Sequence, residues 1–246
     1  MMRQAMIFAA GLGTRLRPLT DTMPKALVPV GGEPLIGHVV ERLRQAGFER
    51  VVVNVHHFPD QIIEYLESHP VEGMQFLVSD EREQLLETGG GLKKAAPLLD
   101  ADSRVLVHNV DILSNADLCA LYDAADCDAT LLVSERETSR YLLFDDNMRL
   151  VGWTNVKTGE VKSPHATLRV EDCRRLAFSG IHVVAPSLLR LMEEWPPRFG
   201  IIDFYLSVCD RMVIRGVVQD GLRMLDVGKV DSLEKASDFE GELKRS

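Results

Sequence analysis

The chain has 246 residues, of which 46% are hydrophobic and 26% are charged, a composition typical of one large globular domain or two small ones. Its formal net charge is −9 and its pI is about 5.3. These values argue against a general nucleic-acid or anionic-membrane surface, because binding to phosphate backbones requires a basic face. We therefore expect neither a nucleic-acid nor a membrane partner, although a local basic pocket remains possible.

The four cysteines form no C-x-x-C pair and lie at no zinc-ligand spacing from a histidine. They are expected to be reduced and mostly buried thiols, as in cytosolic proteins. The first apolar run ends at Gly11, too early for the apolar core of a signal peptide. No stretch approaches the ~20 apolar residues of a membrane span. The sequence predicts a cytoplasmic protein.

Short apolar strands alternate with helical patterns in the first half of the chain. Pro34 stands near the start of the first helical pattern and Gly47 just after its end, which is a common arrangement at helix termini. This alternation predicts right-handed β-α-β units and a mostly parallel sheet with helices on both faces. The strands are expected at 5–9, 51–55, 75–79 and 105–108, and the helices at 34–46, 60–68, 92–99 and 116–125.

Antiparallel pairing is predicted in the second half. Two short strands joined by D-D-N-M-R suit a hairpin whose turn contains Asp146 and Asn147. Gly180 interrupts a longer strand and indicates a bulge or a close backbone approach. The strands are expected at 129–134, 142–145, 150–153, 177–184, 212–218 and 223–227, and the helices at 187–194, 202–211 and 231–243.

No linker, low-complexity tract or internal repeat divides the sequence, so one domain is expected over residues 1–246. Residues 1–115 have the pattern of a nucleotide-binding half, and residues 116–246 add antiparallel strands and a closing helix. The predicted fold class is α/β: a Rossmann-like mixed, mostly parallel sheet flanked by helices, with a smaller antiparallel lobe.

Residues 11–17 read G-L-G-T-R-L-R and follow the first predicted strand directly. Loops at this edge of an open α/β sheet bind ligands, and glycines leave backbone N–H groups uncovered for phosphate oxygens. Arg15 adds a planar guanidinium and Lys25 a point charge. Because Leu16 replaces the third glycine of G-x-G-x-x-G and no G-x-x-x-x-G-K-[ST] occurs, neither a dinucleotide fingerprint nor a P-loop fits.

The stretch F-A-A-G-L-G-T-R-L-R-P-L-T, followed by M-P-K-A-L-V-P-V-G-G-E-P-L-I, closely resembles the signature of sugar-1-phosphate nucleotidylyltransferases. The resemblance continues through L-L-E-T-G-G-G-L-K-K-A, H-N-V-D-I-L, A-F-S-G-I-H-V and L-D-V-G-K-V-D-S-L-E-K-A. The chain looks most like short bacterial N-acetylmuramate-1-phosphate uridylyltransferases and mannose-1-phosphate guanylyltransferase-like proteins. The resemblance implies the nucleotide-diphospho-sugar transferase fold. It also implies a Mg²⁺-dependent enzyme that joins a nucleoside triphosphate to a sugar 1-phosphate and releases pyrophosphate.

The resemblance also implies residue roles at the nucleotide. Backbone atoms of the A-A-G run would meet the base and ribose, and the following G-T-R would hold the β- and γ-phosphates. Arg15 would stabilise the departing pyrophosphate, and Lys25 would bridge the α-phosphate and the sugar phosphate; these two and Asp111 are the implied catalytic residues. Arg17 fits a surface pair with Asp21 equally well. The implied nucleotide-binding residues are Ala9, Ala10, Gly11, Gly13, Thr14, Arg15, Gly89, Gly90 and Asn109. The backbone at Gly89 and Gly90 would read the base edge.

Two aspartates are candidates for holding Mg²⁺. Asp111 ends the strand V-L-V-H-N-V-D, and a carboxylate at this edge of the sheet is well placed for the ion. The resemblance implies that Asp226, in L-D-V-G, is the second ligand; otherwise Asp226 caps the closing helix or a turn. The chain has Val110 where many family members have glycine, and Lys229 where threonine is usual.

The implied sugar-phosphate site consists of Lys25, Glu87, Gly180 and one further lysine. Family members commonly carry that lysine in an E-K-P stretch, but the corresponding region here reads W-T-N-V-K-T-G-E-V-K-S-P. Lys157 is the nearest candidate and Lys162 the second. Gly180 would leave room for the pyranose.

Two other functions stay open. Related sequences transfer a cytidylyl group to phosphocholine, which would require an aromatic or acidic cage, but the chain has only two tryptophans and four tyrosines. A non-catalytic nucleotide-sugar sensor would bind without turnover and would not need the whole set of charged residues. The base, the sugar and the oligomeric state, monomer or homodimer, are left open.

Overall fold

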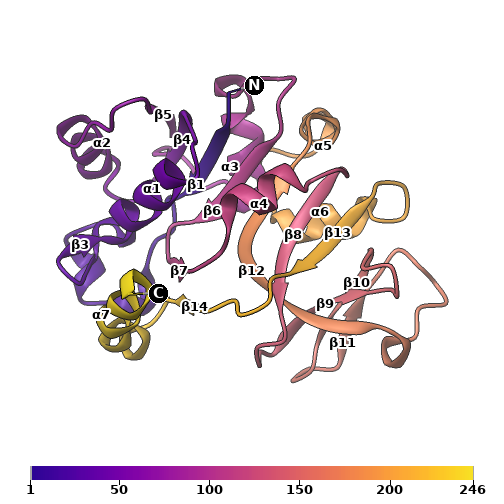
Figure 1. Ribbon diagram of the computed structural model, residues 1–246. Helices are drawn as coiled ribbons and strands as arrows, with labels where there is room; N and C mark the ends of the chain where they lie inside the picture. Colours follow the sequence, from indigo (N-terminus) through magenta and orange to yellow (C-terminus); the bar gives the residue numbers. More distant parts are fainter. Residues whose placement is uncertain (1, 246) are drawn as a thin grey trace.

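A ten-stranded mixed sheet forms the centre of the computed structural model, which describes residues 2–245 (Figure 1). The strand order is β11-β10-β9-β12-β6-β1-β4-β5, with β8 also pairing with β12 and β13 with β8. Strands β5, β4, β1 and β6 are mutually parallel, as the strand–helix alternation predicts. Their bounds are β1 Gln4–Phe8, β4 Arg50–Val55, β5 Gln75–Asp80, β6 Val105–Asn109, β8 Ala129–Ser134, β9 Arg140–Phe144, β10 Leu150–Asn155, β11 Glu160–Lys162, β12 Arg174–Val184 and β13 Ile214–Val218.

Helices cover both faces of the parallel strands, so these strands are apolar throughout. In β1, Ala5 and Ile7 pack toward one face and Met6 and Phe8 toward the other. The first face is covered by α1 and α2, and the second by α3, α5 and α6. The helices are α1 Leu35–Gln45, α2 Pro59–Ser68, α3 Glu87–Ala95, α4 Leu118–Asp123, α5 Pro186–Leu191, α6 Ile201–Val208 and α7 Val230–Arg245.

Strand β12 joins the parallel part of the sheet to the antiparallel lobe. Its first residues pair with β9, and its last residues pair with β6 and β8. The register shifts between Phe178 and His182, and Gly180 within that shift has φ +75°, a value that favours glycine. The predicted bulge is confirmed. Strands β9, β10 and β11 lie at the opposite end of the molecule from α2 (Figure 1).

A short ribbon of two antiparallel strands connects the ends of the chain's two halves. Strand β7 (Ile112–Ser114) begins one residue after Asp111 and pairs with β14 (Met224–Asp226). Asp226 is directly opposite Ile112 in this pairing. Helix α7 contacts both β7 and β14, and it also contacts β2 (Pro29–Val30) of the small hairpin that β2 forms with β3 (Glu33–Pro34).

The predicted fold class is confirmed, and every predicted helix and strand has a counterpart. The helix expected at 92–99 begins earlier, at Glu87, and ends as a 3-10 turn at Leu98. The helix expected at 202–211 ends at Val208. Strands β2, β3, β7 and β11 were not predicted, because pairings of two or three residues have no period to detect. Within residues 2–245 no helix is long and apolar enough to cross a membrane.

Candidate active site

The carboxyl ends of three parallel strands meet at one edge of the sheet. Phe8 is paired with Asn54 on one side and with Asn109 on the other, so β1, β4 and β6 end at the same level. A cavity of about 340 Å³ opens there. Its lining consists of Phe8, Ala9, Ala10, Gly11, Lys25, Asn54, Leu85, Glu87, Thr88, Asn109, Val110 and Asp111.

The glycine-rich loop turns tightly beside this cavity. Gly13 has φ +63°, and its carbonyl oxygen accepts hydrogen bonds from the Thr20 hydroxyl and from the Leu16 N–H. A Cβ at Gly13 would lie 2.8 Å from the Thr20 methyl, so only glycine fits. Gly11 differs, because a Cβ there would meet no atom within 4 Å. Gly11 therefore keeps space open within the cavity, whereas Gly13 is needed for the shape of the loop.

Lys25 and Asp111 form an ion pair on the cavity wall. The Lys25 ammonium contacts Oδ2 of Asp111, and the two side chains are 10% and 19% exposed. Lys25 begins a 3-10 turn directly after Pro24, which has an extended backbone. Because both charges are largely removed from water, the loss of either partner would leave the other charge without compensation. The pair places an ammonium and a carboxylate side by side at the sheet edge.

Arg15 and Asp226 both lie close to Gly228. A Cβ at Gly228 would lie 2.6 Å from Oδ1 of Asp226 and 2.9 Å from Nη2 of Arg15, so the missing side chain allows both groups to approach. The Val227 N–H donates to the Asp111 carbonyl oxygen at 2.8 Å. The β7–β14 ribbon thus brings Asp226 and Arg15 next to the strand end that carries Asp111.

The two aspartates suit a hard cation. Mg²⁺ commonly takes one or two protein carboxylates and completes its shell with phosphate oxygens and water. Val227, the residue after Asp226, is hydrogen-bonded to the Asp111 backbone, and the Lys25 contact uses only one Asp111 carboxylate oxygen. Nowhere in residues 2–245 do three or more Asp, Glu, His or Cys side chains gather as a metal cage. The donor set therefore fits an ion that is shared with a phosphorylated substrate.

A buried polar network supports the cavity from below. The Ala9 N–H donates to Oδ1 of Asn54 at 2.8 Å, and Nδ2 of Asn54 donates to Oε1 of Glu81 at 2.7 Å. The second Glu81 oxygen accepts from the Leu86 N–H, ahead of α3. Burial raises the pKa of the Glu81 carboxyl. The network fixes the A-A-G segment relative to α3, and it shows that the Ala9 N–H already has a partner.

Sequence reasoning did not identify Asn54, Glu81 or Thr88. A detectable signal for Asn54 was its place in the strand V-V-V-N-V, where an amide interrupts an otherwise apolar run. A buried amide must find partners, so such an interruption indicates a built polar contact.

Gly89 and Gly90 pack beneath α6 rather than against the cavity. Both N–H groups donate to the Phe199 carbonyl oxygen, at 2.9 and 3.1 Å. A Cβ would lie 2.3 Å from the Phe199 ring at Gly89 and 2.2 Å from the Pro197 carbonyl oxygen at Gly90. These contacts explain why no side chain fits at either position. A role for the two glycines in reading the base stays a prediction. Glu87 lines the cavity and pairs with Arg198 at 3.0 Å.

The candidate residues for the sugar-phosphate site do not lie together. Gly180 lies behind Asn109, since a Cβ there would be 2.7 Å from Nδ2 of that asparagine. Lys157 lies in an exposed turn and does not line the 340 Å³ cavity. Lys162 lines a separate cavity of about 530 Å³, where its ammonium lies 3.2 Å from Asp203 and 5.3 Å from the Trp153 ring centre.

Three further candidates from the sequence lie at the surface. Arg17 lies 3.2 Å from Asp21 with both side chains more than half exposed, as the surface-pair alternative predicts. Thr14 is exposed in the loop, as is Lys229 after Gly228.

Comparisons with known proteins show what this chain is similar to. A sequence model of the family described as Nucleotidyl transferase matches residues 4–141. The chain is 35% identical over 233 residues to N-acetylmuramate alpha-1-phosphate uridylyltransferase of Caulobacter vibrioides, covering 89% of this chain and 90% of that protein. It is 36% identical over 201 residues to mannose-1-phosphate guanyltransferase of Schizosaccharomyces pombe, covering 78% of this chain and 52% of that longer protein.

The fold is shared with solved structures. The UDP-glucose pyrophosphorylase from Acinetobacter baumanii superimposes with a TM-score of 0.78 at 18% identity, covering all of this chain and 98% of that one. The suspected resemblance is confirmed by the family match and by the uridylyltransferase and guanyltransferase relatives. The chain is a member of the nucleotidyl transferase family.

Proposed function

We propose that this protein transfers a nucleotidyl group from a nucleoside triphosphate to a sugar 1-phosphate. An oxygen of the sugar phosphate attacks the α-phosphorus, the bond from that phosphorus to the β-phosphate oxygen breaks, and pyrophosphate leaves. The attacking oxygen is already anionic, so no general base is needed. The observation that carries the proposal is the Lys25–Asp111 pair beside the glycine-rich loop, with Arg15 and Asp226 next to it.

Two anions must approach each other in this reaction, and fixed positive charge lowers the cost of that approach. Lys25 is held on the cavity wall, where it can contact the α-phosphate and the incoming sugar phosphate. Arg15 follows the Gly13 turn and can stabilise the departing pyrophosphate. The exposed N–H groups of the loop add partial positive charge along the triphosphate.

The residues that would hold Mg²⁺ are Asp111 and Asp226. When bound, the ion would neutralise phosphate charge and polarise the phosphoryl oxygens. Lys25 keeps the Asp111 carboxylate oriented, and Gly228 gives Asp226 and Arg15 room to face the same phosphates. Asn109, which packs against Gly180, extends the cavity wall toward the acceptor side.

A matrix of nucleotides and acceptors tests the proposal. UTP, GTP, CTP and dTTP are each combined with N-acetylmuramate, mannose and glucose 1-phosphates, and pyrophosphate release is followed with Mg²⁺ and with EDTA. We expect one pair to release pyrophosphate in the presence of Mg²⁺, and the relative that matches 90% of its own length favours UTP with N-acetylmuramate 1-phosphate. Nucleotide binding without turnover in every pair would instead favour a sensor.

The phosphocholine alternative has less support. A quaternary ammonium acceptor needs an aromatic face or cage. Phe8 is the aromatic residue lining the 340 Å³ cavity. The Trp153 ring lies in the other cavity, where the Lys162 ammonium is already placed over it. Phosphocholine with CTP is therefore included in the matrix as a control that we expect to stay inactive.

A further inference from the structure

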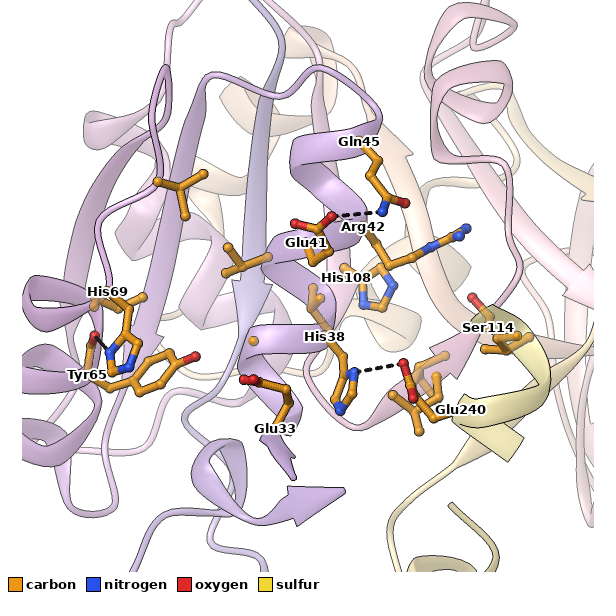
Figure 2. Close-up of a pocket in the computed structure, with 18 of the residues that line it drawn as sticks. Glu33, His38, Glu41, Arg42, Gln45, Tyr65, His69, His108, Ser114 and Glu240 are labelled. Carbon is orange, nitrogen blue, oxygen red and sulfur yellow. Dashed lines mark hydrogen bonds and ion pairs between the residues drawn. The ribbon is translucent and has the colours of Figure 1, made fainter. Parts of the chain in front are cut away.

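A second cavity lies away from the glycine-rich loop. It encloses about 590 Å³, on the face of the sheet covered by α1 and α2, and α7 closes one side (Figure 2). Side chains from α1, α2, α7, β3, β5, β6 and β7 line it. Its size is within the range of small-molecule sites, and polar groups gather over an apolar floor, as they do in such sites.

His108 gives the inner end of this cavity an unused hydrogen-bond acceptor. The residue is 2% exposed, and its Nδ1 lies 2.8 Å from the Asn109 carbonyl oxygen. A carbonyl can only accept, so Nδ1 carries the proton. Burial lowers the pKa of His108 to about 4, so the ring is neutral and Nε2 is a bare acceptor. No described residue donates to Nε2, and a ligand N–H or O–H would satisfy it.

Glu33 and Tyr65 provide an acidic outer end. A Cβ at Gly37 of α1 would lie 2.8 Å from the Tyr65 hydroxyl and 3.5 Å from Oε2 of Glu33, so this glycine opens the space in which the two groups meet. Both side chains point into that space (Figure 2). The Tyr65 ring is stacked on His69, with ring centres 4.2 Å apart. A carboxylate beside an aromatic ring is a favourable setting for an ammonium group.

The charges of the lining have one predominant sign. Glu33, Glu41 and Glu240 are the carboxylates in the lining, and Arg42 is its guanidinium. Glu41 is paired with Arg44 at 2.7 Å, so the negative charge at the outer end comes from Glu33. Arg42 donates to the Ala116 carbonyl oxygen, which occupies part of its donor capacity. His38 lies between the ends, 3.5 Å from Glu240. The site therefore offers acceptors and negative charge, which suits a cationic, donor-rich ligand and not an anion.

We propose that this cavity is a second ligand site, for a small hydroxylated amine such as an amino sugar. The ammonium would lie against Glu33 and Tyr65 at one end of the cavity, and Nε2 of His108 offers an acceptor at the other end. Strand β7 lines the cavity, begins one residue after Asp111 and pairs with the strand that ends at Asp226. Occupancy would thus shift the two carboxylates, a consequence that rests on the proposed function.

Binding is tested with three sugars of one size but different charge: glucosamine, glucose and glucuronate. Calorimetry on the full chain without nucleotide should show saturable glucosamine binding, at least about tenfold weaker glucose binding, and none for glucuronate. Glu33→Gln should weaken glucosamine at least about tenfold and Tyr65→Phe several-fold. Glu67→Gln, on α2 but outside the cavity, should leave binding unchanged.

Equal binding of glucuronate and glucosamine would overturn the proposal, as would unchanged glucosamine binding in Glu33→Gln. Because these measurements contain no nucleotide, they fail independently of the transferase activity. A second measurement follows pyrophosphate release with and without saturating glucosamine. A change in kcat that disappears in Glu33→Gln supports the link to Asp111 and Asp226, and an unchanged kcat removes that link.

Discussion

The Lys25 ammonium contacts the Asp111 carboxylate across a separation of 86 residues, and it does so on the wall of the 340 Å³ cavity. The contact joins the first βα connection to the end of β6. A largely buried ion pair is costly to break, because removing one partner leaves the other charge without compensation. The pair therefore fixes a cation where two phosphates would meet.

Replacing Lys25 by methionine should lower kcat by about 10²–10³-fold, the loss expected when one charge-stabilising group is removed from a transition state. Pyrophosphate release under saturating substrates measures the effect, and circular dichroism checks the fold. Arg17→Met is the matched control. Arg17 is 65% exposed and pairs only with Asp21 on the surface, so its loss should change kcat less than about twofold. Similar losses in the two variants would contradict the role of Lys25.

Asp226→Asn should raise the Mg²⁺ concentration needed for half-maximal activity by about tenfold, because one of the two anionic ligands is lost. Arg15 also loses a neighbouring carboxylate, so the maximal rate should fall as well. The measurement is a Mg²⁺ titration at constant nucleotide concentration. Asp210→Asn, which changes a carboxylate whose partner is Arg211 at the surface, is the control. An unchanged Mg²⁺ titration in Asp226→Asn would remove this residue from the metal site.

Gly11 and Gly90 should respond in opposite ways to alanine. A Cβ at Gly11 meets no atom within 4 Å, so the melting temperature should stay the same while the KM for the nucleotide rises at least several-fold. A Cβ at Gly90 would lie 2.2 Å from the Pro197 carbonyl oxygen, and the variant should lose about 1–3 kcal/mol of stability. Thermal melts and nucleotide titrations separate the two effects. A stable Gly11→Ala with an unchanged KM would place the nucleotide elsewhere.

The sequence predicted the features that depend on consecutive residues. The apolar runs predict the parallel strands, and the position of Asp111 at a strand end predicts its place at the sheet edge. Contacts between distant segments had no such signal. Gly89 and Gly90 were interpreted as base-reading residues, but the 197–200 segment that requires them is more than a hundred residues away.

Contacts between distant segments also decide the surroundings of the two aspartates and of the two candidate lysines. Asp226 was associated with Asp111 through resemblance alone, and the β7–β14 ribbon that joins them is too short to predict. Lys157 was ranked ahead of Lys162 from its position in the sequence alone, and the contacts of Lys162 with Asp203 and Trp153 had no sequence signal. The 590 Å³ cavity is lined by residues of seven helices and strands, and no one of these segments had a sequence signature for it.

His182 should make the protein sensitive to acid. Its ring is fully buried among Phe8, Phe178 and Tyr205, and neither nitrogen has a hydrogen-bond partner within the described chain. Burial lowers the pKa of His182 from 6.5 to about 3. Between these two pH values the unfolded chain binds a proton at His182 and the folded chain does not. The stability present above pH 6.5 therefore decreases as the pH falls from 6.5 toward 3.

His182→Phe removes this proton uptake and keeps an aromatic ring at the same place. Urea denaturation at several pH values from 7.5 to 4.5 should show a decline in the free energy of unfolding that is shallower in the variant, by up to about 1.4 kcal/mol per pH unit. His108 has a lowered pKa of about 4 and remains in both proteins, so part of the decline persists. Equal m-values establish that the unfolded states are comparable. Parallel stability curves for the two proteins would show that His182 takes up its proton in the folded state and that its burial does not exclude charge.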